Sequence, residues 1–367
     1  MDNAEPFIFD GHNDLLSKLW AEGGVAAIDT VAAGRNGAID VPKAKRGGFG
    51  GGFFAVYIPS PMNMDLDALF ELMRQPKYDI PLPEPIERDA ALPVAIGQIA
   101  ILFALERAGF LRVCRTVADI LAARQDDQIA AILHIEGAEA IDHDLYALDV
   151  LYQAGLRSLG PVWSRPNIFG HGVPFRFPSS PDTGDGLTDH GLRLVKRCDE
   201  LGIMIDLSHL NEAGFWDVAR NSEKPLVATH SNPHALCTHS RNLTDDQLRA
   251  IRESDGMVGL NFAVSFLRED GRKIAETPVE TMLAHLDYLI AHLGEDRVGL
   301  GSDYDGAIVP EAVTDISQLP VLRAAMRRHG YDEALIEKIC HGNWLRLLER
   351  SWGERDPAQT PQQGETR

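Results

Sequence analysis

The segment 7–14, with the sequence FIFDGHND, decides the predicted fold because it joins a short apolar run to two potential metal ligands. If residues 7–9 form a buried strand, His12 and Asp14 follow at its carboxyl end, two positions apart. Side chains at positions i and i+2 of an extended chain lie on the same face, so this imidazole and this carboxylate would project together. A lone His-x-Asp pair is weak evidence, and its value depends on whether other apolar runs end in the same way.

Seven further apolar runs are candidate strands, and they cover residues 52–58, 129–135, 156–162, 203–207, 226–229, 257–262 and 298–301. Segments with helical signals lie between most of them. Residues 187–201 begin with a Thr-Asp capping signal, 244–254 with a TDDQ capping box, and 278–293 carry apolar residues at a helical period. Strands that alternate with helices indicate βαβ units and a parallel sheet. Eight such strands predict an α/β fold, the closed (β/α)8 or TIM barrel.

We predict one catalytic domain over residues 1–352, with loop excursions at about 60–86 and 167–186. The first excursion is rich in proline, and the second is so rich in glycine, proline and serine that we expect no regular element there. Both follow predicted strands, where barrel enzymes build their active sites. Residues 332–352 are predicted to form a closing helix, and the polar tail 353–367 is predicted to be disordered.

The composition narrows the class of protein. A net charge of −19 argues against nucleic acids and anionic membranes as partners. The four cysteines are widely spaced, which argues against a zinc ribbon or a disulfide scaffold. We recognise neither a signal peptide nor an apolar run of membrane-spanning length, so the cytoplasm is the expected compartment. A homodimer would be common for such a barrel, but the sequence leaves the oligomeric state open.

Residues with ligand or proton-transfer chemistry follow five of the predicted strands. They are His12 and Asp14 after the first, Glu136 after the third, His209 after the fifth, His230 after the sixth and Asp303 after the eighth. In a parallel barrel, the carboxyl ends of all strands open onto one face. Each residue alone has a commoner role as a packed histidine or a turn carboxylate. Six of them at one predicted face would require several independent coincidences, so we expect a functional site.

Three histidines and three carboxylates suit a pair of divalent metal ions. Each zinc ion takes about four or five nitrogen and oxygen ligands, and a carboxylate can bridge two ions. We expect His12 and Asp14 to hold one ion and Glu136 to bridge it to the second. His209 and His230 would hold that second ion. A water between two such ions becomes a nucleophile near neutral pH, which leaves the carboxylate after the eighth strand free as general base and later acid.

The other histidines are interpreted from their positions. His134 shares a strand face with Glu136, and we expect it to support the site or the core rather than to bind metal. The histidines in helical or linking stretches are expected to be structural or solvated, and they are His143, His190, His285 and His292. The histidines in loops near the predicted mouth stay undecided, and they are His171, His234 and His239.

At these residues the sequence resembles the renal or membrane dipeptidase family of binuclear zinc peptidases, family M19 of the amidohydrolase superfamily, and in particular its bacterial branch. The matching segments are DGHNDL (10–15), IEG (135–137), IDLSH (205–209), THS (229–231), SRNLTDD (240–246) and GSDYDG (301–306). They occur in family order across about three hundred residues. Each segment alone is weak evidence, but their ordered combination is highly specific.

The resemblance implies a barrel of the metal-dependent hydrolase type that holds two zinc ions per chain, although other divalent metals suit the same ligands. It implies the same ligand assignment as the strand-end argument, and it makes Asp303 the catalytic acid and base. Arg241 matches the residue that receives the terminal carboxylate of the substrate, a role suited to a planar bidentate donor. The alternative is an exposed loop arginine that pairs with Asp245 and Asp246.

One position departs from the family pattern. Members usually carry a histidine at the end of the fourth strand, and Trp163 stands there in this chain. An indole N–H can donate a hydrogen bond to an oxyanion, but it cannot supply positive charge. Arg165 or His171 could take over that role, or Trp163 could simply shape the pocket wall. Trp163 is therefore a candidate substrate-binding residue, and the oxyanion stabiliser stays open.

The predicted function is zinc-dependent hydrolysis of dipeptides, including those with a D-residue at the carboxyl terminus. Arg241 would then measure substrate length and exclude longer peptides. Because of Trp163, a related amidohydrolase acting on N-acyl amino acids, lactones or other amides is the alternative. A phosphotriesterase-like site is disfavoured because residues 156–163 contain no lysine. A silent barrel used only for binding is also disfavoured, since all six site positions are filled.

Overall fold

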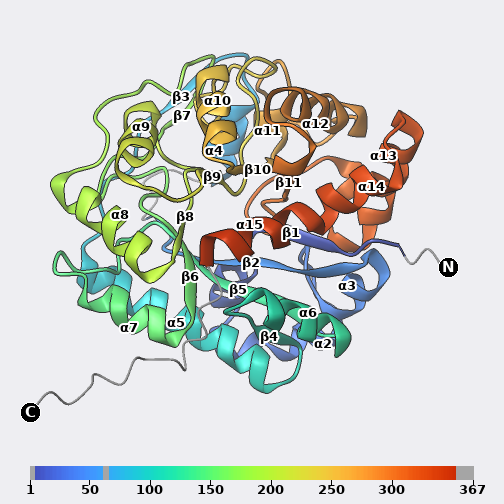
Figure 1. The fold of residues 1–367 in the computed structure, drawn as a ribbon, viewed down its shortest axis with the longest axis horizontal. Helices are drawn as coiled ribbons and strands as arrows, with labels where there is room; N and C mark the ends of the chain where they lie inside the picture. The colour runs from blue at the N-terminus through green and yellow to red at the C-terminus, as the bar shows by residue number, and fades with distance from the viewer. Residues whose placement is uncertain (1–4, 61–65, 353–367) are drawn as a thin grey trace, which may run out of the picture.

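The computed structural model describes residues 5–60 and 66–352, and its centre is a ring of parallel strands (Figure 1). The ring strands are β1 (Ile8–Asn13), β2 (Phe49–Tyr57), β5 (Ile129–Glu136), β6 (Leu156–Gly160), β8 (Met204–Ile205), β9 (Val227–Ala228), β10 (Met257–Asn261) and β11 (Val298–Gly301). They are hydrogen-bonded in chain order, and β11 pairs with β1. A bridge between Asp206 and Val227 joins β8 to β9. The predicted TIM barrel is confirmed, and each of its strands lies on a predicted apolar run.

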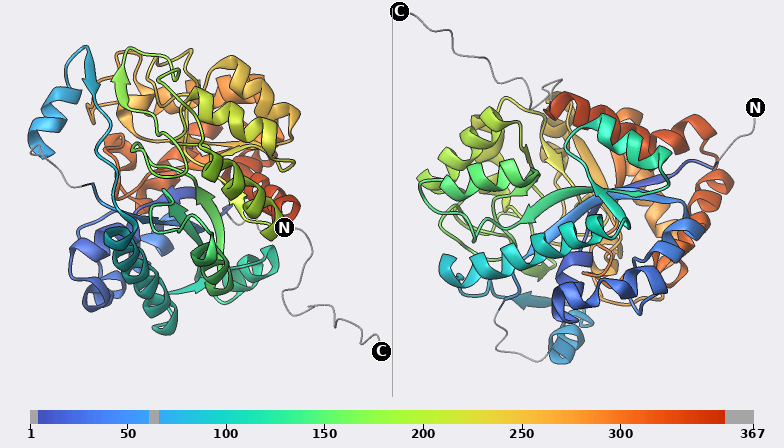
Figure 2. Two further views of the ribbon diagram at one scale, coloured as in Figure 1. Left: turned by 90° about the vertical axis from the view of Figure 1, so that its left-hand side faces the viewer. Right: turned by 90° about the horizontal axis from the view of Figure 1, so that it is seen from below.

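Helices surround this ring (Figures 1 and 2). The α-helices are α1 (Leu15–Ala21), α2 (Asp29–Ala33), α3 (Val41–Gly47), α4 (Leu66–Met73), α5 (Arg88–Arg107), α6 (Val117–Gln125), α7 (Tyr146–Ala154), α8 (Asp189–Leu201), α9 (Glu212–Asn221), α10 (Asp245–Glu253), α11 (Val264–Leu267), α12 (Val279–Leu293), α13 (Leu319–His329), α14 (Glu333–Glu337) and α15 (Asn343–Trp352). Short turns are η1 (Gly24–Ala27), η2 (Glu295–Arg297), η3 (Glu311–Val313), η4 (Ile316–Gln318) and the π-helical η5 (Lys338–Gly342). Thr188 caps α8 and Thr244 caps α10, as their sequence signals predicted.

The amino end of the barrel is filled by apolar side chains. Phe9, Phe53 and Met257 pack with Trp344 of α15, and the indole Nε1 of Trp344 donates to Leu300 O at 3.1 Å. Figure 1 shows α15 lying across the ring of strands. The closing helix predicted over 332–352 is divided into α14, η5 and α15. Because one end is closed by packing, polar side chains can gather only at the carboxyl ends of the strands.

The two loop excursions meet each other beside the barrel. β3 (Tyr78–Ile80) belongs to the first excursion and β7 (Phe175–Phe177) to the second, and they pair as antiparallel strands. The prediction of no regular element within 167–186 is therefore wrong for β7, because its partner strand lies about a hundred residues away in the sequence. A further strand, β4 (Leu111–Val113), adds to β5. Residues 61–65 of the first excursion, and the tail 353–367 predicted to be disordered, lie outside the described residues.

Helix α5 corrects the expectation that no apolar run in the chain reaches membrane-spanning length. It is 20 residues long, and an 18-residue window within it reaches a mean hydropathy of 1.6, so it could span a membrane by length and composition alone. Its apolar positions include Ala91, Ala95, Ile99 and Leu102, which are buried in the main core. α5 packs against α1, β2 and β4 in the way of a barrel helix, and such a core helix passes the same test of length and composition.

Candidate metal centre and active site

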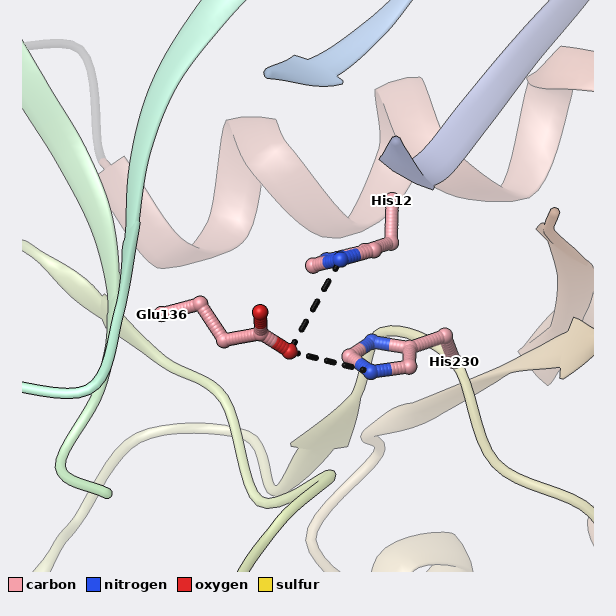
Figure 3. A group of neighbouring side chains, drawn as sticks. All are labelled: His12, Glu136 and His230. Carbon is pink, nitrogen blue, oxygen red and sulfur yellow. Dashed lines mark ion pairs between the residues drawn. The ribbon is translucent and has the colours of Figure 1, made fainter. Parts of the chain in front are cut away.

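Glu136 lies at the centre of a buried histidine cluster at the carboxyl end of the barrel. Its Oε1 lies 2.9 Å from His209 Nε2, 3.5 Å from His230 Nε2 and 3.7 Å from His12 Nε2. Figure 3 shows the imidazoles of His12 and His230 facing the same oxygen of the Glu136 carboxylate, and the two rings are stacked with their centroids 3.9 Å apart. Asp14 joins the cluster from the end of β1, because its Oδ2 lies 3.4 Å from His12 Nε2. The structure thus brings together all five predicted ligands.

The cluster fits a divalent metal ion on two observations. Ligand atoms about 2.1 Å from a tetrahedral zinc ion lie about 3.4 Å from one another, which matches the 2.9–3.7 Å between Glu136 Oε1 and the three imidazole nitrogens. His12 is fully buried, and neither of its ring nitrogens has a hydrogen-bond partner within the described part of the chain. A buried imidazole without such partners is costly unless another ligand satisfies it.

Two hydroxyl groups orient His209 and His230, which are predicted metal ligands. His209 Nδ1 lies 2.8 Å from Ser164 Oγ, and His230 Nδ1 lies 2.8 Å from Thr229 Oγ1. Thr229 Oγ1 itself donates to Asp206 Oδ2 at 2.6 Å, so it can accept from the Nδ1–H of His230. This arrangement leaves Nε2 of each imidazole as the lone-pair atom that faces Glu136. Sequence reasoning missed these supporting residues, although each is adjacent to a named residue or lies within a quoted motif.

Burial and neighbouring charges shift the pKa values of the clustered residues in different directions. Burial raises the pKa of Glu136 well above its usual 4.5, and nearby Asp14 and Asp303 add to that rise while His12 opposes it. Burial would lower the pKa of His12, but attraction to the surrounding carboxylates outweighs it and raises that pKa to about 10. Burial holds the pKa of His209 and of His230 well below 6.5, which keeps both imidazoles in the neutral, metal-binding form.

Asp303 lies beside this cluster in a turn that follows β11. Ligand atoms of His12, Asp14 and Asp303 all lie within 4.8 Å of one another. Asn261 Nδ2 donates to Asp303 Oδ2 at 3.0 Å, which fixes one carboxylate oxygen. Asn261 was not identified as a site residue from the sequence. It ends β10, so the strand-end argument applied to the run 257–262 could have found it.

Arg241 is buried at the same mouth and is not the exposed arginine of the alternative interpretation. Its Nη2 lies 3.4 Å from His209 Nε2 and donates to His230 O at 3.2 Å. Within the described part of the chain, no carboxylate oxygen lies within 4.0 Å of its guanidinium. Asp245 and Asp246 instead bind Tyr288 and Arg249. A buried arginine without a carboxylate partner is suited to bind an anionic group.

Trp163 lies in an aromatic group next to His209. Its ring lies 5.0 Å from Tyr57, 5.7 Å from Phe175 and 5.8 Å from His209, measured between ring centroids, and it is half-buried. The two residues considered as alternative oxyanion stabilisers make contacts with other groups. Arg165 is paired with Glu139, and His171 Nδ1 contacts Gly186 O. Of the three residues considered as oxyanion stabilisers, Trp163 is the one that lies next to a predicted ligand, His209.

The remaining histidines lie away from the ligand cluster or support it. His134 is buried, its Nδ1 lies 2.9 Å from Ser158 Oγ, and burial lowers its pKa to about 3. His285 is also buried, and its Nε2 lies 2.8 Å from Leu267 O. The undecided His239 accepts from the Arg241 N–H at 3.0 Å, so it supports the loop that carries that arginine.

The barrel and its histidine–carboxylate cluster together define a hydrolase of the metal-dependent type. The model of the membrane dipeptidase family, peptidase family M19, matches residues 3–360, and the chain therefore belongs to this family. A crystal structure of a metallo peptidase from Rhodobacter sphaeroides, liganded with a phosphinate mimic of the dipeptide L-Ala-D-Ala, is similar at 56% identity with a TM-score of 0.93. That comparison covers 95% of this chain and 100% of the other.

Two further relatives agree with this family assignment. The crystal structure of the metallo peptidase dipeptidase AC, also of family M19, is 55% identical with a TM-score of 0.92, over 95% of this chain and 100% of that one. A protein of Klebsiella pneumoniae, described as an uncharacterized protein in the pqqA 5' region, is 50% identical over 257 residues. These residues are 70% of this chain and 95% of the relative. The family resemblance seen in the sequence motifs is confirmed.

Proposed function

We propose that the protein is a dipeptidase that hydrolyses the peptide bond of dipeptides with two bound zinc ions. Membership of peptidase family M19 supports the reaction class, and the dipeptide mimic in the relative that is 56% identical supports a dipeptide substrate. One observation carries the proposal most directly. Three imidazole Nε2 atoms lie within 3.7 Å of one buried carboxylate oxygen of Glu136.

The proposed ligand assignment is the one that the strand-end positions and the family resemblance imply, and the convergence of three imidazoles on Glu136 supports it. His12 and Asp14 would hold one ion, His209 and His230 the other, and Glu136 would lie between them. Bound divalent ions would polarise the scissile carbonyl and lower the pKa of the attacking water. Zinc is the preferred metal because neutral imidazoles and carboxylates are its usual ligands, and cobalt or manganese could replace it.

Asp303 is the group proposed to move the proton. One of its carboxylate oxygens is held by Asn261, and within the described part of the chain the other accepts no hydrogen bond. That second oxygen could take a proton from the attacking water and pass it to the nitrogen of the departing amino acid. The D-configuration accepted at the carboxyl-terminal residue is part of the proposal and rests on the phosphinate mimic of L-Ala-D-Ala.

Arg241 is proposed to bind the terminal carboxylate of the substrate. The guanidinium is buried beside His209 and His230, so a carboxylate bound there would lie close to the metal cluster, as the terminal carboxylate of a short substrate requires. A longer peptide would have to place its backbone where the guanidinium lies. The site would therefore favour dipeptides over tetrapeptides.

The test is hydrolysis of L-Xaa-L-Xaa and L-Xaa-D-Xaa dipeptides by zinc-loaded protein, with tetrapeptides and N-acetyl amino acids measured in parallel. Asp303→Asn should lower kcat by about 10³-fold or more while two metal ions per chain stay bound, because proton transfer is lost and the ligands remain. Asp29→Asn, at an exposed position, is the matched control and should keep full activity. Turnover of N-acetyl amino acids without turnover of dipeptides would contradict the proposal and favour the amidohydrolase alternative.

A further inference from the structure

The turn that carries Asp303 has an unusual backbone. Asp303 and Asp305 both lie in the left-handed region, with φ of 61° and 67°. Aspartate tolerates this region better than most residues, but two such residues within three positions persist only when their surroundings hold them. The conformation of the turn is therefore set by its contacts with other segments.

One side of this turn is held by a distant segment near the amino terminus. Arg35 Nη1 donates to Asp305 Oδ2 at 3.0 Å, and the Ala38 N–H donates to Asp305 Oδ1 at 2.8 Å. Both carboxylate oxygens of Asp305 are thus bound by residues about 270 positions away in the sequence. Arg35 and Asp305 have side chains that are only 2% and 3% exposed.

Arg35 is itself held in place from two directions. Its Nη2 donates to Glu22 Oε1 at 2.8 Å, and its backbone N–H donates to Asp40 Oδ2 at 3.1 Å. The guanidinium is therefore a fixed bridge between the segment after α1 and the turn. A planar guanidinium that binds one carboxylate through Nη1 and another through Nη2 has little freedom to turn, so it restricts the position of the Asp305 carboxylate.

The other side of the turn packs directly against the proposed metal and proton-transfer groups. A Cβ atom at Gly306 would lie 2.1 Å from Asp14 Oδ2 and 2.9 Å from Asp303 Oδ1, so the backbone approaches both carboxylates as closely as a glycine allows. The Asp303 N–H donates to His12 O at 3.0 Å. A shift of this turn would therefore move the Asp303 carboxylate relative to Asp14 and His12.

We propose that Arg35 is a positioning residue for catalysis, which fixes the Asp303 carboxylate by holding Asp305 two residues further along the same turn. It also neutralises Asp305, which would otherwise add a negative charge beside the site. The proposal rests on the dipeptidase function proposed above. The simpler alternative is that Arg35 only stabilises the fold through a buried ion pair.

The test compares Arg35→Met, Arg35→Lys and the matched control Glu22→Gln in zinc-loaded protein. Arg35→Met should lower kcat by about 10- to 100-fold, with KM changed by less than about threefold, because a small misplacement of a catalytic group costs rate rather than binding. Its metal content should stay at the wild-type level. Arg35→Lys should recover part of kcat. Glu22→Gln removes a charge but keeps an amide oxygen that can accept the bond from Arg35 Nη2, so the bond to Asp305 stays in place and kcat should stay near the wild-type value.

Each outcome decides between the two roles. The positioning role would be overturned if both Arg35→Met and Glu22→Gln keep the wild-type kcat per metal-loaded molecule. An equal fall in the free energy of unfolding of the two variants would then show that Arg35 only stabilises the fold. If Arg35→Met does not fold, Asp305→Asn replaces it, and a kcat unchanged in that variant would overturn the proposal equally. A wild-type protein that binds metal and cleaves no dipeptide would instead contradict the proposed function itself.

Discussion

Two loops at the mouth of the barrel each bring a buried arginine to the site, and the two guanidinium groups differ in their hydrogen-bond and ion-pair partners. After β6, Arg165 donates from Nη2 to Glu139 Oε1 at 2.8 Å and to Ile58 O at 3.0 Å, and from Nη1 to Ser60 Oγ at 2.6 Å. After β9, Arg241 makes no bond shorter than 3.2 Å from its guanidinium to any described residue. Both side chains are almost fully buried.

This difference indicates that Arg165 has a structural role, whereas the guanidinium of Arg241 is available to bind a ligand. Desolvation of a charged group costs free energy, and in Arg165 that cost is offset by an ion pair and several hydrogen bonds. Arg241 lacks such an offset in the protein alone, so an incoming carboxylate would supply it. Burial accordingly lowers the pKa of Arg241 to about 10, while Asp303, Glu136 and Asp206 oppose that fall.

The largest effect is expected from Arg165→Met. Removal of the guanidinium leaves Glu139 buried without a partner, which should lower the free energy of unfolding by about 3–5 kcal/mol. Denaturant unfolding measures this loss, and the double variant with Glu139→Leu should recover much of it. If Arg165→Met keeps its stability and loses activity instead, Arg165 takes part in the reaction. The structural role assigned to Arg165 would then be wrong.

Arg241→Met should show the opposite result, a large loss of activity with little loss of stability. We expect kcat/KM for a dipeptide to fall about 100-fold, equivalent to about 2.7 kcal/mol of lost transition-state binding. Its free energy of unfolding should stay within about 1 kcal/mol of the wild-type value or rise, since an uncompensated buried charge is removed. The control is the same dipeptide with an amidated carboxyl terminus, for which the variant and the wild type should be equally slow. An equal loss on that amide would contradict carboxylate binding.

The smallest effect concerns the pH dependence of the Arg241 loop. Burial, followed by the charges of Arg241, His234 and Lys273, lowers the pKa of His239 well below its usual 6.5. The folded protein then keeps this imidazole neutral while the unfolded chain binds a proton. Stability from His239 is therefore complete above pH 6.5 and falls as the pH drops below it, by at most about 1.4 kcal/mol per pH unit.

The measurement is thermal unfolding of the wild type and of His239→Gln at pH 7.5 and pH 5.5. The wild type should lose more stability between the two pH values than the variant does. Contributions from the histidines proposed as metal ligands are common to both proteins and cancel in this difference. A variant with the same pH dependence as the wild type would show that His239 is not held neutral in the folded state.

The amino-acid sequence by itself determined the barrel and the proposed metal ligands. Strands buried in a parallel sheet are nearly continuous apolar runs, so all eight ring strands could be located from local apolar runs, although not their exact ends. The polar residues that follow them converge because parallel strands end at one face, which is why His12 and Glu136 could be paired although they lie 124 positions apart in the sequence. Those inferences need only local patterns and one topological rule.

Only the tertiary structure decided which distant side chains meet. The pairing of β3 with β7, the bond between Asn261 and Asp303, and the ion pairs Arg165–Glu139 and Arg35–Asp305 leave no periodic signal in the sequence. Arg165 and Arg241 look alike as loop arginines, and their roles differ only through the carboxylates that the fold places near them. The physical reason is that hydrogen bonds and ion pairs act over a few ångströms, and the sequence specifies such distances only through the complete packing of the chain.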